Sequence, residues 1–195
     1  MKSSRLTVAV CSLLLVVGCS TNRVNLQYSA EGAPTAISAR AGISVGQFND
    51  ARGEPANWFG AIRGGFGNPI KVMETDKPVS SVVASAFSDG LKTRQALASP
   101  EGGAFELRGT VKRFDCDQYA RREATAEIEV TVKRLGDGAI VYYGTKTANN
   151  IGGSAVTLAA GVFGSVEELR KIAEQTLREV VDKTLDDPEF RKALQ

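Results

Sequence analysis

A ten-residue alternation at 124–133 constrains the fold more strongly than any other feature of the sequence. Apolar residues (Ala, Ile and Val) hold its even-numbered positions, and Thr, Glu and Lys hold the odd ones. A period of two residues is typical of a β-strand that buries one face and exposes the other to water. Residues 105–112 alternate in the same way, and a third predicted strand at 139–147 follows the turn-forming pair Asp137 and Gly138. We therefore expect an antiparallel meander of three strands.

Two amphipathic helical stretches flank the meander. Apolar residues recur three and four positions apart at 78–97 and again at 166–185, which is the period of a helix with one buried face. Pro78 suits the first turn of a helix, and Ser165 with Glu168 has the spacing of a capping box. We therefore expect two helices that pack their apolar faces on the sheet.

The rest of the chain adds shorter strands to this plan. A strand is expected at 41–48, and residues 24–28 have the alternation of a short edge strand. Residues 54–68 have no regular period and predict a long glycine-rich loop, followed by a short strand at 70–73. Together these elements predict an α+β fold, an antiparallel-rich sheet of four to five strands with two amphipathic helices packed on one face. The opposite face of the sheet is left to water or to a partner.

The first nineteen residues have the pattern of an export signal. Two basic residues precede an apolar run at 6–17, which is too short to cross a bilayer as a helix. The residues VVGC at 16–19 resemble the bacterial lipobox. That resemblance implies cleavage before Cys19, a diacylglyceryl group on its sulfur and a palmitate-type acyl chain on its amine. An ordinary secretory signal and an uncleaved anchor helix are the alternatives.

These features divide the chain into three parts. We expect a lipoprotein signal peptide at 1–18, an acylated N terminus and tether at 19–37, and a single periplasm-facing domain at 38–195. Residues 20–36 are rich in Ser, Thr, Asn, Gly and Pro, a composition that suits a flexible tether. Ser20 rather than Asp follows the cysteine, which by analogy with Gram-negative sorting favours the outer membrane over the inner membrane.

Charge and residue usage exclude several classes of function. The full chain has 24 basic and 22 acidic residues, and residues 1–18 hold two basic residues and no acidic one, so the mature chain has no formal net charge. That balance removes a bulk electrostatic attraction for nucleic acid. The chain has no histidine, which excludes Ser-His-Asp and Cys-His catalysis and His-ligated zinc. Because a nucleophile motif and a metal-ligand cluster are also missing from the sequence, we expect no enzyme activity, no metal and no cofactor.

Cys116 is the one thiol that stays free once Cys11 is removed with the signal and Cys19 is acylated. It lies between Asp115 and Asp117, whose negative charges disfavour the thiolate and lower its reactivity. We therefore expect a structural cysteine at the end of a strand rather than a reactive one.

Asp50 and Arg52 follow the predicted strand at 41–48 and form the first candidate binding site. In a turn, the Asp50 carboxylate would accept backbone N–H bonds while Arg52 pairs with an acid. On an extended segment the two side chains would lie on one side and suit a ligand. Both interpretations stay open, and the turn-locking one is the simpler.

The second candidate is the uncharged segment at 151–164. It contains Leu158, Val162 and Phe163 together with four glycines. A contiguous apolar patch on a protein surface usually signals an interaction. The segment is therefore packed under the sheet, dipped into a membrane or bound to a partner.

Basic residues near the expected strand ends predict a solvated, salt-bridged edge, with binding of an anionic lipid or glycan as the alternative. A hydrolase would need two of the acids there at a fixed separation. The basic members are Lys112, Arg113, Arg121 and Arg122, and the interleaved acids are Asp115, Asp117 and Glu123.

Several of these features together resemble the YajG-type family of bacterial lipoproteins. They are the lipobox, the run VGQFNDAR at 45–52, the glycine-rich loop with Ile62 and the helix-meander-helix order. The resemblance covers most of the mature chain, and its most specific element is Asp50-x-Arg52. It implies an outer-membrane lipid anchor and a periplasm-facing domain, without an established biochemical activity.

We therefore expect a non-catalytic, membrane-anchored lipoprotein of the bacterial cell envelope. Its partners would be the membrane, through the lipid on Cys19, and another envelope protein or lipid. An auxiliary lipoprotein of a lipid or solute transport system is the alternative, and a hydrolase of envelope polymers is a third class.

Overall fold

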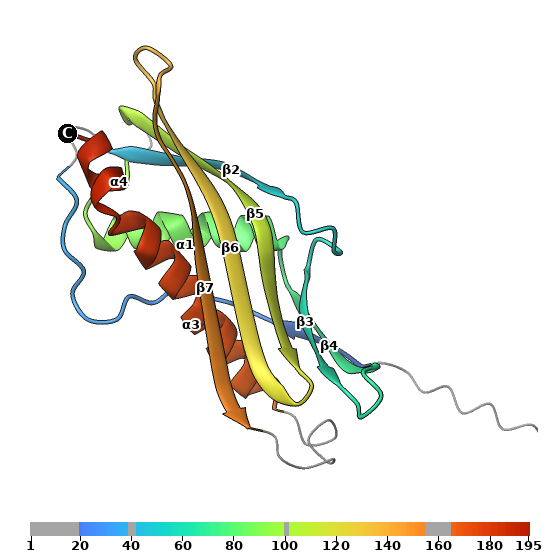
Figure 1. Ribbon diagram of the computed structural model, residues 1–195. Helices are drawn as coiled ribbons and strands as arrows, with labels where there is room; N and C mark the ends of the chain where they lie inside the picture. The colour runs from blue at the N-terminus through green and yellow to red at the C-terminus, as the bar shows by residue number, and fades with distance from the viewer. Residues whose placement is uncertain (1–19, 39–41, 100–101, 155–164) are drawn as a thin grey trace, which may run out of the picture.

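The computed structural model describes residues 20–38, 42–99, 102–154 and 165–195. Within these ranges, seven strands form one mixed sheet and three helices pack against it (Figure 1). The strands are β1 (Ser20–Val24), β2 (Ile43–Asp50), β3 (Trp58–Arg63), β4 (Pro69–Thr75), β5 (Phe105–Gln118), β6 (Arg121–Arg134) and β7 (Ile140–Ser154). The helices are α1 (Val79–Thr93), α3 (Val166–Leu185) and α4 (Pro188–Ala193).

The sheet has the spatial order β1-β4-β3-β5-β6-β7, and β2 lies off this path. β5 takes two parallel neighbours along one edge, because β2 pairs with Phe105–Val111 and β3 with Cys116–Gln118. β1 is also parallel to β4, whereas the β3–β4, β5–β6 and β6–β7 pairs are antiparallel. The predicted α+β class is confirmed. The predicted four to five strands are too few, and the sheet mixes both pairing types, because parallel pairings join segments that lie far apart in the sequence.

The meander of β5, β6 and β7 follows the alternation in the sequence. The apolar residues of the 124–133 run are all buried, each with at most 1% of its surface exposed. The three strands extend beyond their predicted limits, to 14, 14 and 15 residues, because each pairs with its neighbour over almost its whole length. These three strands are the longest in the sheet.

α1 and α3 cover one face of the sheet, as predicted (Figure 1). α1 begins directly after Pro78, and α3 begins after Ser165, whose hydroxyl accepts a backbone N–H bond from the first turn at 3.3 Å. The two helices approach closely at Gly90. A Cβ atom on that residue would lie 2.8 Å from side-chain carbons of Val181 and Leu185, so a larger residue would push the helices apart.

β3 corrects the prediction of a long loop at 54–68. Phe59, Gly60, Ala61 and Ile62 are buried in succession, and the strand lies between β4 and β5. A strand that buries consecutive residues has no alternation in its sequence. The sequence of β3 therefore gives no periodic signal of a strand.

The described part of the predicted tether belongs to the folded domain. β1 pairs with β4 and begins four residues before the strand that was expected at 24–28. Val24, Leu26 and Tyr28 then point into the core, with at most 9% of each residue exposed. Burial of these three large apolar side chains lowers the free energy of the folded state, and this outweighs the polar composition around them.

The C-terminal segment forms a short helix, α4. Asp187 caps α4 by accepting the backbone N–H of Glu189 at 2.9 Å. Phe190 is fully buried and meets the ring of Tyr142 edge-on, with 5.2 Å between the ring centroids. One aromatic anchor therefore docks this short helix against β7.

Candidate functional site

The candidate functional site lies where the chain enters the sheet after the lipobox. Ser20, the first residue of β1, directly follows Cys19, and consecutive Cα atoms are about 3.8 Å apart. Ser20 pairs in register with Lys71, near the start of β4. We call the surface formed by Ser20 and the turns at 64–68 and 119–120 the anchor end.

Hydrogen bonds give the two turns of the anchor end a defined shape. In the β3–β4 turn, Gly64 N–H donates to the Asn68 carbonyl at 2.8 Å and Gly67 N–H donates to the Gly64 carbonyl at 2.9 Å. The Tyr119 hydroxyl, in the β5–β6 turn, donates to the Gly65 carbonyl at 3.0 Å. The two turns are therefore joined to each other.

Aromatic side chains project from both turns. The Phe66 side chain is fully exposed, and about half of Tyr119 is exposed. Neither residue was among the predicted site residues. The signal for Phe66 was its place between glycines, because such a turn has no neighbouring side chains that would cover a ring.

Three arginines border the same turns. Arg63 lies 3.2 Å from the Asp117 carboxylate, and Arg121 lies 2.8 Å from the Glu123 carboxylate. Arg122 donates to the neutral Gln118 side chain at 3.2 Å. Residues 63–69 and 118–122 contain these three arginines and no carboxylate.

Asp117 and Glu123 face each other across the β5–β6 pair. Burial raises the pKa of Asp117, which accepts bonds from the backbone N–H of Ala61 at 3.0 Å and from Arg63 at 3.2 Å. A hydrogen bond from Asn149 and an arginine partner hold the pKa of Glu123 below its ordinary value. Both carboxylates therefore take part in contacts that fasten this end of the sheet.

Asp50 and Arg52 form an ion pair that fixes the β2–β3 loop. The Arg52 side chain is only 3% exposed and forms a two-pronged ion pair with Asp50, at 2.9 and 2.7 Å. Its remaining contacts are to backbone carbonyls of Pro55, Ala56, Trp58 and Phe114. The structure therefore gives this pair the turn-locking geometry and leaves no accessible guanidinium for a ligand.

Cys116 is fully buried in β5. Burial, with the two neighbouring aspartates, raises its pKa to about 12. Its thiol donates to the Leu169 carbonyl of α3 at 3.4 Å. Its contacts are those of a packing residue at the sheet–helix interface.

Cys19 and the apolar candidates Leu158, Val162 and Phe163 lie outside the described residues. The last residue of β7, Ser154, is in register with Arg121. The chain therefore leaves β7 at the anchor end before it reaches these three apolar residues.

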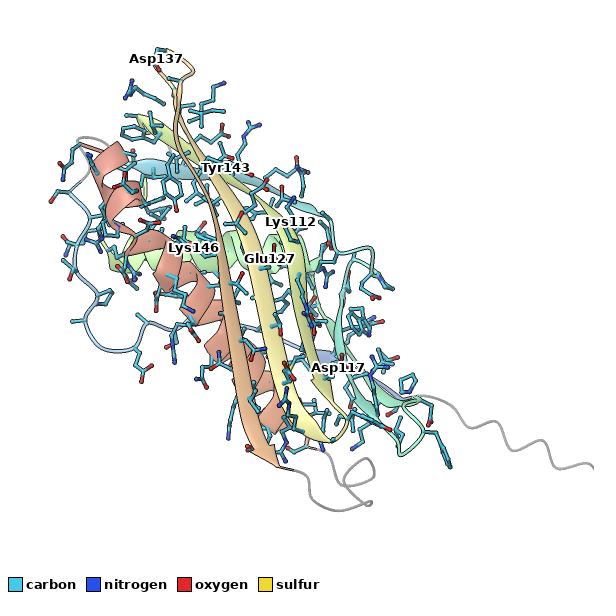
Figure 2. The ribbon with its side chains drawn as sticks, viewed as in Figure 1. Lys112, Asp117, Glu127, Asp137, Tyr143 and Lys146 are labelled. Carbon is cyan, nitrogen blue, oxygen red and sulfur yellow. The ribbon has the colours of Figure 1, made fainter. Side chains whose placement is uncertain are left out.

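The basic residues of the uncovered sheet face are held in ion pairs. Lys112 lies 3.3 Å from Glu129, which also accepts the Tyr143 hydroxyl at 2.9 Å, and Arg113 pairs with Asp115. Figure 2 shows Lys112 and Tyr143 along this part of the sheet, with Asp117 nearer the anchor end and Asp137 at the opposite turn. The predicted salt-bridged surface is present here.

The described ranges contain neither a metal-type cluster of side chains nor a membrane-spanning helix. No group of three or more His, Cys, Asp or Glu side chains gathers there in a way that suits a metal ion. None of the helices in these ranges combines the length and the apolar character that crossing a membrane requires.

The fold resembles that of protein XCC0632 from Xanthomonas campestris, which is assigned to the family DUF330. The TM-score is 0.61 with 15% identity, over 89% of this chain and 96% of that one. The PelC dodecamer from Paraburkholderia phytofirmans (TM-score 0.44, 13% identity, 77% and 92% covered) and lipoprotein GNA1162 from Neisseria meningitidis (0.31, 12%, 67% and 99%) are more distant. No family model and no curated protein matches the sequence. The first similarity shows a shared fold, and the YajG-type resemblance stays a prediction.

Proposed function

We propose that this chain is a non-catalytic, lipid-anchored lipoprotein of the bacterial envelope. Its domain would lie at the periplasmic face of the outer membrane and bind or assist another envelope component. The observation that supports this most directly is the position of β1, whose first residue follows the lipobox cysteine. A lipid on Cys19 would be joined to the sheet itself rather than to a distant tether.

Acylation at Cys19 supplies enough apolar chain for stable attachment. Each buried CH₂ contributes about 0.8 kcal/mol, and one acyl chain alone gives only reversible binding. A diacylglyceryl group with a third acyl chain exceeds that requirement. The lipid would therefore hold the domain at the bilayer surface permanently.

The uncovered face of the sheet would then be available to a partner. α1 and α3 occupy the other face, while Tyr143 is 64% exposed within a field of paired charges. The apolar segment with Leu158, Val162 and Phe163 is a second contact candidate, as its sequence predicts. A mixed polar and aromatic surface of this kind is typical of non-obligate protein interfaces.

Radiolabelled palmitate and membrane sedimentation test the proposal in intact cells. The parent should incorporate label, sediment with membranes and give a specific crosslinked adduct, and Cys19→Ser should lose all three. Cys116→Ala is the matched control. Because Cys116 is buried and is not the proposed acylation site, this variant should incorporate the label as the parent does. A Cys19→Ser form that still sediments, or a parent that forms no adduct, would contradict the proposal.

A further inference from the structure

We propose that the anchor end is a membrane-contact surface, in which Phe66 and Tyr119 enter the interfacial layer of the bilayer that holds the Cys19 lipid. This inference rests on the proposed function, because it takes the lipid on Cys19 as given. It adds an orientation of the domain and a second point of contact with the lipid.

The strand pairings bring the start of β1 close to both aromatic turns. Ser20 pairs with Lys71, and β4 begins two residues earlier, directly after the turn that carries Phe66. β3 pairs in parallel with the end of β5, so its last residues lie beside the turn that carries Tyr119. The start of β1, which follows Cys19 in the chain, and both aromatic turns therefore lie at one end of the sheet (Figure 1).

The two aromatic residues have side chains that suit the interfacial layer. Phe66 presents a fully exposed ring on a turn whose backbone is held by internal hydrogen bonds. Tyr119 exposes part of its ring while its hydroxyl is bound to Gly65. Transfer of an apolar ring out of water lowers its free energy. Tyr favours the headgroup layer because it combines an apolar body with a polar tip.

The charges next to the rings come from three arginines. Arg121 and Arg122 border the Tyr119 turn, and Arg63 borders the Phe66 turn, with no carboxylate within either turn. Arginine side chains at a membrane surface keep their charged heads among the phosphates while their apolar stems lie deeper. Arg63 and Arg121 pair with the two acids behind the turns, and Arg122 bonds to a neutral side chain. The three arginines therefore exceed these two acids by one positive charge, which anionic headgroups complement.

The opposite end of the sheet lies away from Ser20, has an acid within its turn, and exposes aliphatic rather than aromatic side chains next to that turn, Leu135 and Ile140. The β6–β7 turn carries Asp137, which lies 2.9 Å from Arg134, and its apolar residue Leu135 is 47% exposed. Figure 2 shows Asp137 at the far turn and Asp117 nearer the anchor end. If the anchor end meets the bilayer, the 15 residues of β7 carry the far turn roughly 50 Å along the strand direction.

Depth-dependent quenching tests this orientation on the lipoprotein purified from membranes. Phe66→Cys and, as the matched control, Leu135→Cys are labelled with an environment-sensitive fluorophore and reconstituted in phosphatidylethanolamine–phosphatidylglycerol vesicles that contain nitroxide-labelled lipid. Cys116 is fully buried and should not react in the folded protein. We expect quenching at 66 to exceed that at 135 by at least about twofold, because only the interfacial label approaches the nitroxides.

The possible outcomes separate the two proposals. Equal quenching at 66 and 135, or none at 66, in protein that carries labelled palmitate would overturn the membrane-contact surface and leave the lipid anchor standing. Protein without palmitate would overturn the proposed function and, with it, this inference. A Tyr119→Ser form that lowers quenching at 66 while its unfolding midpoint stays within the range of the parent would add the second aromatic residue to the contact.

Discussion

Two arginines, Arg52 and Arg94, bury their side chains almost completely and reach that state in different ways. Arg52 is satisfied within its own loop, by Asp50 two residues away and by backbone carbonyls. Arg94, which is 1% exposed, pairs with Asp182 and Asp186 at the end of α3, 88 and 92 residues along the chain. A buried cation can therefore organise a single turn or join distant elements, depending on where its acceptors come from.

Each arginine fixes a segment next to one strand of the sheet. Arg52 holds the loop that leads into β3 and also donates to Phe114 in β5, so it fixes where β3 begins. Arg94 donates to the Tyr28 hydroxyl at 3.1 Å, which ties the segment after β1 to the ends of the helices. Arg52 therefore fixes the start of β3, and Arg94 fixes the segment that follows β1.

The largest effect is expected for Arg94→Met. Removing the guanidinium leaves Asp182, Asp186 and Tyr28 without their shared donor, so the free energy of unfolding should fall by about 3 kcal/mol. Urea unfolding followed by the fluorescence of Trp58, the single tryptophan, measures the loss. Arg134→Met, at an exposed ion pair, is the control and should change stability by less than about 0.5 kcal/mol. Equal losses in the two variants would show that the Arg94 cluster contributes no more stability than an exposed ion pair.

A smaller effect is expected for Arg52→Met, about 2 kcal/mol, because the carbonyls of the exposed loop residues Pro55 and Ala56 regain water when the side chain is removed. Arg108→Met is the matched control on the same sheet, since the Arg108 side chain is 63% exposed beside Glu106. The same urea titration applies. If Arg52→Met lowered the free energy of unfolding as much as Arg94→Met does, or more, the predicted order of the two effects would be wrong.

The smallest effect is a pH dependence at Asp50. Its hydrogen bonds from Arg52 hold the pKa of Asp50 below its ordinary value of 3.8, so the folded state binds a proton less readily than the unfolded state does. The stability from this pair is therefore present above about pH 4 and is lost as the pH falls through 3.8 toward the lower folded pKa. The difference in unfolding free energy between the parent and Asp50→Asn should be at most about 1 kcal/mol at pH 7 and should shrink below pH 4. A difference that grows on acidification would contradict this sign.

The elements that sequence patterns predicted are those with local causes. The alternation at 124–133 became β6, the 3.6-residue stripe after Pro78 became α1, and Ser165 caps α3. The pairing of Asp50 with Arg52 is also local, because the two residues are neighbours in one turn. In each case the determinants lie within a few residues of one another.

The features that the patterns missed depend on distant partners. β3 has no alternation because it lies between β4 and β5 inside the sheet and buries successive side chains, on both of its faces. α4 depends on Phe190 meeting Tyr142, and the segment after β1 depends on Leu26 and Tyr28 entering the core. β3 and α4 have no periodic mark in the local sequence, whereas the alternation at 24–28 marks the buried residues but does not show what they pack against.

For the candidate site, the sequence by itself determined the lipobox pattern and the identity of the residues around it. Only the tertiary structure decided that Ser20, Phe66 and Tyr119 share one end of the sheet, because the β1–β4 and β3–β5 pairings bring three separate segments together. Short-range patterns follow from backbone geometry and solvent exposure, which each segment carries alone. Parallel pairing and shared burial depend on segments tens of residues apart, so they appear only when the chain is folded.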